Sequence, residues 1–471
     1  MDSDSRLSIL FVLETAPENS NSLAFLNSYI DSLCEIMSEE ISLSLFYTEH
    51  SSTEEHYSLN ILPGPKYVKL VTYIPERYTS FRDTFSNSRM EDVFRYILKD
   101  EGFDCVHIWS LKNHSFNYPF IAKDKNIPVV MSVHDGFLMS NDIFSKGHSE
   151  ERNIRISNFV TTPLNLFLKK ASSFFNQEGK RSNWFENIGR YSSYYNRVKT
   201  SLVSDSAIDE RNTLADEVIK FTDRFIFTSE IEYNLFYRTV VPENKAIFIE
   251  QGIFCDGTFE NRPFEIEGAV KFGFLGEILP EEGILELVEA FNALYQNGFQ
   301  NELHIYGEMY ENGPYFSRLR KRAVNPNIFF HGPIQPGRVN SVIKTFDVLV
   351  IPSKWHRSDS FLINTALSSR KAVVVSGRNS VSEKVRRASR GIIIDDTTVK
   401  DLFEAVSELE RNRKRLYYFM RVTEDLKFPD IEENLQNFLD IYSGISKKKK
   451  DFDSILLKRR ALKRKFDRIR G

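Results

Sequence analysis

The feature that most constrains the fold of this chain is a regular alternation between short runs of β-branched and aromatic residues and longer stretches of helical period. The short runs have the length of strands, and in the longer stretches apolar residues recur every three or four positions. Such alternation is typical of parallel sheets covered by helices on both faces. It occurs twice, first through "LSILFVLE", "ISLSLFYT", "VKLVTYI", "CVHIWS" and "PVVMSVHD", and again from "VKFGFLG" through "VLVIPS" and "AVVVSG" to "GIIIDD".

The two series predict two domains. The first series resumes with "RFIFTS" and "AIFIEQG" and ends at a polar, proline-bearing linker, "CDGTFENRPFEIEG". We therefore expect an α/β chain of two Rossmann-like doubly wound domains, one over residues 1–265 and one over residues 266–446. Open sheets of this kind bind ligands beyond the carboxyl ends of their strands, so the expected site lies in a cleft between the domains.

From residue 136 to about residue 222 the strand-like runs stop, which predicts a helical insertion in the first domain. One part of it is dense in aromatic residues. Packing inside a helical core is the simpler interpretation of these side chains, and stacking on sugars or filling a protein interface is the alternative. Helix candidates are "TTPLNLFLKKASSFF" and "SDSAIDERNTLADEVIKF", and the aromatic part is "SSFFNQEGKRSNWFENIGRYSSYYNRV".

Composition excludes several classes of protein. The 471 residues, 41% of them hydrophobic, suffice for the cores of about two to three domains. The three cysteines, Cys34, Cys105 and Cys255, form no C-x-x-C pair, so neither a disulfide framework nor a thiolate zinc site is expected. Acidic residues precede the short apolar run at the N-terminus, and no segment approaches the roughly 20 apolar residues of a membrane span. The sequence therefore predicts a cytoplasmic protein.

Residues 447–471 form a separate basic segment. They carry twelve lysines and arginines against three aspartates, whereas the whole chain has a formal net charge of −3. Apolar residues recur among the cations at roughly helical intervals, which favours a basic amphipathic helix that binds an anionic membrane surface. A solvated tail lying on the acidic body of the protein is the alternative. No nucleic-acid recognition fold accompanies the charge, so nucleic acid is not an expected partner.

The second series contains segments whose order and spacing resemble one known family. They are "FLGEILPEEGILELVEAF", "ELHIYGE", "IFFHGPI", "DVLVIPSKW", "INTAL", "AVVVSG" and "GIIIDD". Together they resemble retaining glycosyltransferases of the GT-B fold, in particular the large family 4 group. The first domain matches more loosely, through "VHIWS", "IPVVMSVHDGF", "DRFIFTS" and "IEQGIF". The resemblance implies an acceptor bound to the first domain and a nucleotide-sugar donor bound to the second, with no metal and no further cofactor.

Two loops that the family uses to bind the donor are changed here. The family neutralises the donor diphosphate with Arg and Lys in the loop after the first strand of the second domain. This sequence has "GEILPEEG", which places Glu277 and Glu282 at those positions. The family also has a glycine-rich loop after the first strand of the first domain, which lets the backbone approach the donor. The corresponding "ETAPENSNSLAF" has no glycine.

A third change concerns the pair of glutamates that the family uses to bind the donor sugar and the ribose. Alignment without a gap places Arg357 and Thr365 at these positions, and a shift that brings Asp359 onto the first still leaves Thr365 at the second. The resemblance therefore implies an altered nucleotide-binding site. In it Lys354, Arg357 or Lys371 would replace the missing cations, and plain surface charge is the alternative for these residues.

Other positions of the family site are retained. His134 ends a strand and aligns with a family histidine that contacts the donor sugar, and Asp135 beside it would orient the ring or cap the next helix. We take both as the candidate catalytic residues. Gly276 and Glu383 align with the nucleotide-binding side of the site, although Glu383 also fits a capping box that begins at Ser380.

Two functions remain open from the sequence. One is a glycosyltransferase that moves a sugar from a nucleotide-sugar donor to a glycan or lipid-linked acceptor in surface polysaccharide or glycoconjugate synthesis. The other is a catalytically inactive relative that serves as a scaffold or as a glycan-binding or partner-binding subunit. Intact frame residues beside three changed site elements are compatible with either. Under both we expect a cytoplasmic protein, peripheral on the inner face of the membrane if residues 447–471 bind it.

Overall fold

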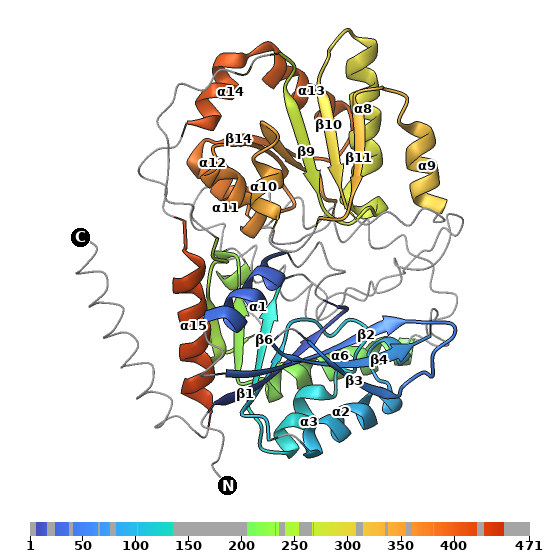
Figure 1. Ribbon diagram of the computed structural model, residues 1–471, viewed down its shortest axis with the longest axis vertical. Coiled ribbons are helices and arrows are strands. Elements are labelled where there is room, and N and C mark those ends of the chain that lie inside the picture. The colour runs from blue at the N-terminus through green and yellow to red at the C-terminus, as the bar shows by residue number, and fades with distance from the viewer. Residues whose placement is uncertain are drawn as a thin grey trace, which may run out of the picture.

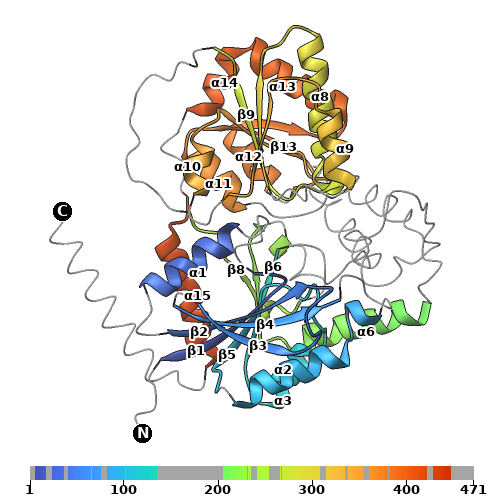
Figure 2. The ribbon, with the colours of Figure 1, turned by 45° about the vertical axis from the view of Figure 1, so that its right-hand side comes forward.

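The computed structural model of the protein contains two α/β domains, which lie one above the other in Figures 1 and 2. One domain is built on an eight-stranded sheet and the other on a six-stranded sheet. The structure describes residues 6–16, 24–36, 41–64, 66–75, 82–100, 102–134, 205–230, 232–234, 241–253, 266, 268–307, 314–334, 338–354, 360–379, 381–421 and 428–446.

The first domain alternates strands and helices along the chain. Its strand order is β3-β4-β2-β1-β5-β6-β7-β8, and every neighbouring pair is parallel except β3 and β4. The elements are β1 (Leu7–Leu13), α1 (Ala24–Ile36), β2 (Ile41–His50), β3 (Leu59–Pro63), β4 (Val68–Ile74), α2 (Ser88–Asp100), β5 (Cys105–Ile108), α3 (Tyr118–Asp124), β6 (Val129–Val133), α6 (Asp205–Phe221), β7 (Arg224–Phe227) and β8 (Ala246–Phe248).

The second domain repeats the pattern with parallel strands in the order β11-β10-β9-β12-β13-β14. Its elements are β9 (Lys271–Leu275), α8 (Ile284–Gln296), β10 (Glu302–Tyr306), α9 (Pro314–Arg322), β11 (Ile328–Gly332), α10 (Val339–Ile343), β12 (Val348–Ile351), α11 (Ser360–Ser368), β13 (Ala372–Ser376), α12 (Ser382–Ala388), β14 (Gly391–Ile394), α13 (Val399–Arg411) and α14 (Arg413–Met420).

The continuous apolar runs of the sequence become the central strands because both faces of each sheet are covered. β5, β6, β12 and β13 are buried along their whole length. At the sheet edges the strands are more exposed, as in β3 and β11. The predicted fold class of two Rossmann-like doubly wound domains is therefore confirmed. The predicted strands did not include β3, whose short antiparallel segment at the edge carries no long apolar run.

The described end of the predicted insertion is helical. α6 covers most of the candidate "SDSAIDERNTLADEVIKF", lies beside α3 and leads into β7. It is therefore part of the connection between two neighbouring parallel strands, β6 and β7. The remainder of the predicted insertion, including its aromatic part, lies outside the described residues.

The helix α15 (Ile431–Ile445) packs against the first sheet, although the predicted second domain, residues 266–446, includes it. Figures 1 and 2 show it in red beside α1 and the strands of the first domain. Leu435, Phe438, Leu439 and Tyr442 follow helical spacing and are all buried. The ring centroid of Phe438 lies 4.7 Å from that of Tyr29 in α1. The chain thus returns to the first domain after completing the second.

The chain passes from one domain to the other twice, first after β8 and again just before α15. These two crossings are hydrogen-bonded to each other. The Ile253 N–H donates to the Pro429 carbonyl at 2.9 Å, and the Ile431 N–H donates to the Ile253 carbonyl at 3.0 Å. Gly252 lies directly against this bridge. A Cβ atom at residue 252 would be 2.7 Å from Asn434 Cβ and 2.8 Å from the Asp430 carbonyl oxygen. Only glycine therefore fits where the two crossings meet.

Replacing Gly252 by alanine is expected to lower the free energy of unfolding by about 1–3 kcal/mol, because backbone atoms of the second crossing must shift. Gly444→Ala is the matched control. A Cβ atom at residue 444 in α15 would meet nothing within 4 Å, and glycine inside a helix costs roughly 0.5–1 kcal/mol relative to alanine. Urea unfolding of both variants checks this, and equal effects at the two positions would contradict the close contact at Gly252.

No helix of the described residues is both long enough and apolar enough to cross a membrane. The basic segment 447–471 lies outside those residues.

Candidate functional site

The strand orders place the expected ligand positions at the carboxyl ends of two pairs of strands. In each sheet the order of connection reverses once, between β1 and β5 in the first domain and between β9 and β12 in the second. Ligands of doubly wound sheets bind at such reversal points. In the second domain Gly276 follows β9 and Lys354 follows β12 closely. These two sequence-predicted residues therefore lie together at the reversal point.

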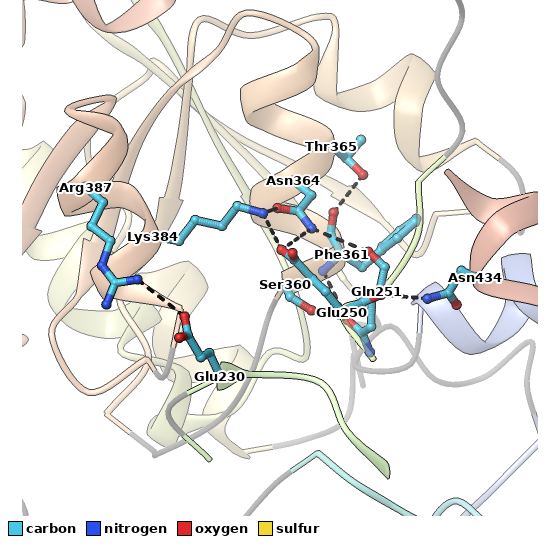
Figure 3. A network of polar contacts seen from close by, with 10 residues as sticks. All are labelled: Glu230, Glu250, Gln251, Ser360, Phe361, Asn364, Thr365, Lys384, Arg387 and Asn434. Atoms are coloured by element: carbon cyan, nitrogen blue, oxygen red, sulfur yellow. Dashed lines mark hydrogen bonds and ion pairs between the residues drawn. The ribbon is translucent and has the colours of Figure 1, made fainter. Parts of the chain in front are cut away.

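The carboxyl edges of the two sheets face each other. Gln251, three residues after β8, accepts hydrogen bonds through Oε1 from the Ser360 hydroxyl at 2.8 Å and from the Phe361 N–H at 3.0 Å. Both donors lie at the start of α11, which follows the carboxyl end of β12. A second contact joins Glu230, after β7, to Arg387 of α12 at 3.3 Å. Figure 3 shows these contacts between the domains.

His134 lies at the carboxyl end of β6, on an aromatic stack. Its ring is nearly parallel to that of Trp109, with an interplanar angle of 5° and 5.3 Å between the centroids. Trp109 follows β5 and also stacks on Phe438 of α15, at 5.7 Å and 17°. The imidazole is therefore held on rigid elements at the edge that faces the second domain. Asp135, the other candidate catalytic residue, lies outside the described residues.

Trp109 was not among the predicted site residues. The sequence signal was present in "CVHIWS", where a large aromatic residue follows a buried strand at its carboxyl end. Because Trp109 is 3% exposed, its role is to support the ring of His134 rather than to meet a ligand.

A series of buried, hydrogen-bonded side chains near His134 connects α15 to the first sheet. His107 Nδ1 is 2.6 Å from the Tyr442 hydroxyl oxygen, and His107 Nε2 is 2.9 Å from Ser132 Oγ. The Tyr442 hydroxyl also lies 3.3 Å from that of Tyr29. Burial, with a smaller contribution from nearby His134, holds the pKa of His107 well below its ordinary value. His107 is therefore a neutral structural link and not a proton carrier of the site.

The loop after β9 is compact. The Gly276 N–H donates to the Tyr306 carbonyl at 3.1 Å, which fixes the turn at the end of β9. A short 3-10 turn, Pro280–Glu282, follows, and Gly283 adopts the left-handed conformation at φ 70° before α8 begins. Glu282 is only 7% exposed. The loop thus places a buried carboxylate at the position where the family resemblance expects a cation.

Two described cations at this edge, Lys354 and Arg378, are bound to carboxylates. Lys354 Nζ is 2.6 Å from Glu286 Oε1, in the first turn of α8. Arg378, which follows β13, lies 3.2 Å from Asp396 Oδ1 and donates to the Lys354 carbonyl at 3.2 Å. An anionic ligand would have to compete with these carboxylates for the same groups. Arg357 lies outside the described residues, so its place in the site remains a prediction.

Thr365 does not point toward the facing domain. It is 2% exposed, and its hydroxyl donates to the Phe361 carbonyl one turn earlier in α11, at 2.7 Å. This back-bonding to the helix satisfies the hydroxyl internally. The position predicted to meet the nucleotide is therefore a core position of the second domain.

Thr365→Val is expected to cost about 1 kcal/mol of stability, the value of one neutral hydrogen bond, and to leave ligand affinity unchanged. Thermal unfolding and calorimetric titration with nucleotide diphosphates check the two halves of this expectation. A variant that folds normally but loses nucleotide binding would place Thr365 in the ligand site after all.

Lys371 lies at the amino ends of the strands of the second sheet, whereas the expected site lies at their carboxyl ends. It immediately precedes β13, is 5% exposed, and donates through Nζ to the Lys344 carbonyl at 3.0 Å. Burial lowers its pKa, while the nearby Asp347 acts in the other direction. The prediction that Lys371 replaces a missing cation of the site does not fit this position, because the amino ends of parallel strands lie away from the carboxyl edge.

Glu383 lies in the first turn of α12 and forms ion pairs with Arg386 and Arg387 of the same helix. Val381 precedes the helix, without a side-chain cap. Ser380 lies outside the described residues, so the predicted capping box is not seen in the described part of this helix. Glu383 thus lies at the carboxyl edge of the sheet, where a nucleotide-binding role stays a prediction.

Sequence reasoning missed a polar cluster that joins the two domains. In Figure 3 the carboxylate of Glu250, from the first domain, meets Lys384 and Asn364 of the second. Asn434 of α15 donates to the Glu250 carbonyl at 2.6 Å. No local pattern reveals such a cluster, because its members lie on four segments far apart in the sequence.

Comparisons with known proteins agree with this architecture. Residues 258–421 match the family "glycosyl transferases group 1". The lipopolysaccharide 1,2-N-acetylglucosaminetransferase of Salmonella typhimurium is 22% identical over 229 residues, which cover 44% of this chain and 60% of that protein. The match therefore spans less than two thirds of the relative's length.

Solved structures resemble the whole chain. Sucrose-phosphate synthase from Thermosynechococcus elongatus has a TM-score of 0.58 at 13% identity, over 97% of this chain and 99% of that one. Anabaena HepE, solved with UDP and glucose, has a TM-score of 0.59 at 12% identity, over 93% of this chain and 100% of that one. At these identities the likeness shows the fold, and membership of the family 4 group stays a prediction. The chain therefore has the GT-B fold that these glycosyltransferases share, and its residues 258–421 are similar to the glycosyl transferases group 1 family.

Proposed function

We propose that the protein is a glycosyltransferase that moves a sugar from a nucleotide-sugar donor to a glycan or lipid-linked acceptor in the synthesis of a surface polysaccharide or glycoconjugate. The observation that carries the proposal is the placement of His134. Its ring is held on Trp109 at the carboxyl edge of the first sheet, opposite the edge formed by Gly276 and Lys354. The Salmonella relative, named as an N-acetylglucosaminetransferase of lipopolysaccharide, supports the choice of acceptor class.

Each side of the site would have its own task. The first domain would bind the acceptor, and His134 would contact the sugar being transferred. The second domain would hold the nucleotide diphosphate, whose charge grows as the bond to the sugar breaks, so fixed positive charge there would favour the reaction. The HepE structures contain UDP, glucose and UDP-glucose, which supports a uridine nucleotide as the first donor to test.

A second candidate function is a catalytically inactive relative that binds a glycan or a partner protein. The internal hydrogen bond of Thr365 and the ion pairs of Lys354 and Arg378 favour it, since these groups satisfy one another without a ligand. A scaffold needs the two-domain frame but no free diphosphate site.

Calorimetric titration of the full chain with UDP, UDP-glucose and UDP-N-acetylglucosamine tests the proposal. We expect saturable binding of all three. His134→Ala should weaken the two nucleotide sugars and leave UDP unchanged, because His134 is proposed to meet the sugar alone. Arg357→Ala should weaken all three. Absence of binding to any of a full set of nucleotide diphosphates and their sugars at millimolar concentration would refute the enzyme and favour the scaffold.

We infer further that residues 447–471 bring the protein to the inner face of the membrane as a peripheral, cytoplasmic protein. Cations near an anionic bilayer contribute about 1 kcal/mol each, and residues 447–471 contain twelve. Liposomes with anionic lipid are expected to retain the full chain and to release a chain truncated before Lys447, whereas neutral liposomes retain neither. Equal retention of both chains on anionic liposomes would refute the inference.

A further inference from the structure

The ammonium group of Lys384 is held in place by neutral groups as well as by a carboxylate. It donates to Asn364 Oδ1 at 2.7 Å and lies 5.5 Å from the centroid of the Phe428 ring. Both contacts keep a cation in a fixed position without cancelling its charge. The third contact is an ion pair with the carboxylate of Glu250. Removal of this carboxylate would therefore leave the cation in place.

Asn364 provides a second donor to the same point. It is fully buried, and its Nδ2 donates to Glu250 Oε1 at 3.0 Å. Because its Oδ1 accepts from Lys384, the amide is oriented by the lysine, and its Nδ2 donates both to the carboxylate and to the Gln251 carbonyl, at 3.4 Å. Lys384 and Asn364 thus converge on one oxygen atom, as Figure 3 shows.

The carboxylate that fills this position comes from the other domain. Lys354 and Arg378 pair with Glu286 and Asp396 of their own domain, so those pairs persist however the domains are placed. Glu250 instead lies in the first crossing, two residues after β8, and is 27% exposed at its side chain. Whether the Glu250 carboxylate contacts Lys384 and Asn364 therefore depends on how the first crossing packs against α11 and α12.

We propose that Lys384 and Asn364 form an oxyanion site, for a phosphate or a carboxylate group of a ligand, and that Glu250 occupies it in the arrangement seen here. This site rests on the proposed function and adds to it a binding position for a charged group of the ligand. A nucleotide sugar would supply a diphosphate, and an acidic glycan would supply carboxylates. It lies at the edge where doubly wound sheets bind phosphates, and it supplies positive charge that the loop at Glu277 and Glu282 lacks. A ligand that enters it displaces the Glu250 carboxylate and loosens the crossing, which Gln251 still joins to α11.

Two test anions, inorganic pyrophosphate and glucuronate, distinguish a ligand that binds through phosphate from one that binds through carboxylate. Calorimetric titration uses the full chain, Glu250→Gln, and the double variant Glu250→Gln/Lys384→Met. Glu250→Gln should bind one of the two anions at least about tenfold more tightly than the wild type, because it removes a competing charge-assisted hydrogen bond. The double variant should lose this gain. Glu230→Gln is the matched control, because Glu230 is the other described carboxylate of the first domain that contacts α12. This variant should show no gain in affinity for either anion.

Absence of a gain in Glu250→Gln for both anions would overturn the proposal, and so would an equal gain in Glu230→Gln or a gain that survives in the double variant. A second measurement needs only the wild-type chain. Saturating anion should increase amide hydrogen exchange in residues 249–253, and unchanged exchange at saturation would overturn the displacement of Glu250. These outcomes do not depend on sugar transfer, so failure here and failure of the proposed enzyme activity are distinguishable.

Discussion

The first domain is expected to lose free energy of unfolding when the pH falls from 6.5 to 4.5, about 2 kcal/mol of it from His114, because two buried histidines resist protonation in the folded chain. His107 and His114 are 0% and 1% exposed. Burial holds the pKa of His107 well below its ordinary value and lowers that of His114 to about 4, against 6.5 for an unperturbed histidine. The unfolded chain therefore binds more protons than the folded chain below pH 6.5.

The sign follows from these pKa directions. A histidine with a depressed pKa contributes fully above its unfolded value, and its contribution falls as the pH drops toward the folded value. A histidine that is protonated in the unfolded chain and neutral in the folded chain accounts for at most about 1.4 kcal/mol per pH unit. His114 Nε2 lies 2.6 Å from the Leu13 carbonyl oxygen, and that contact and nearby Glu14 act against the shift, but burial is the largest effect.

Urea unfolding at pH 7.0, 5.5 and 4.5, followed by circular dichroism, measures this dependence. The wild-type slope includes carboxylates, so the comparison that matters is with His107→Gln and His114→Gln. Each variant should reduce the slope, by at most about 1.4 kcal/mol per pH unit. A slope that is the same in the wild type and both variants would show that these imidazoles titrate alike in the folded and unfolded chains.

His134→Ala is expected to reduce the rate of sugar transfer by about 100-fold, the usual effect of losing a group that positions the reacting centre. The ring lies on Trp109 at the carboxyl edge of the sheet, and the substitution removes the contact with the transferred sugar that we propose for it. The fall should be in kcat/KM for the nucleotide sugar, while the affinity for UDP stays the same. Initial rates with a coupled assay for UDP release measure it.

His331→Ala is the control for this variant. His331 lies on β11, the outermost strand of the second sheet, beside His304 and two strands away from β9, where the order of connection reverses. Its removal should leave the transfer rate within about twofold of the wild type, as surface substitutions away from a site usually do. Equal loss of rate in both variants would mean that His134 acts through stability rather than through contact with the sugar.

The sequence predicts most of the fold, because the fold follows from local patterns. Runs such as "AVVVSG" and "LSILFVLE" are apolar throughout, and in a chain of alternating strands and helices only central parallel strands bury such runs on both faces. The prediction fails where long-range packing decides. α15 has a helical apolar face that fits either domain, and the contacts of Phe438 and Tyr442 with the first sheet are not visible in its sequence.

The site is less predictable for the same reason. Lys371 and Lys384 are both lysines close to buried strands in the sequence, yet one lies at the amino edge of the sheet and the other meets a carboxylate of the facing domain. A resemblance aligns positions but not environments, so Thr365 at a ligand position of the family is here a core residue. The position of His134 fits the site that the resemblance implies because the carboxyl end of a parallel strand fixes which edge it occupies.

Sugar transfer itself tests the proposed function most directly. The full chain is incubated with each of a set of nucleotide sugars, beginning with UDP-glucose and UDP-N-acetylglucosamine, and with truncated lipopolysaccharide or another lipid-linked glycan. Release of the nucleotide diphosphate and the mass of the acceptor are then measured. The proposal predicts release from one donor, with addition of one sugar to the acceptor and loss of both in His134→Ala. A folded protein that binds the glycan but consumes no donor would contradict the enzyme and identify the chain as a glycan-binding scaffold.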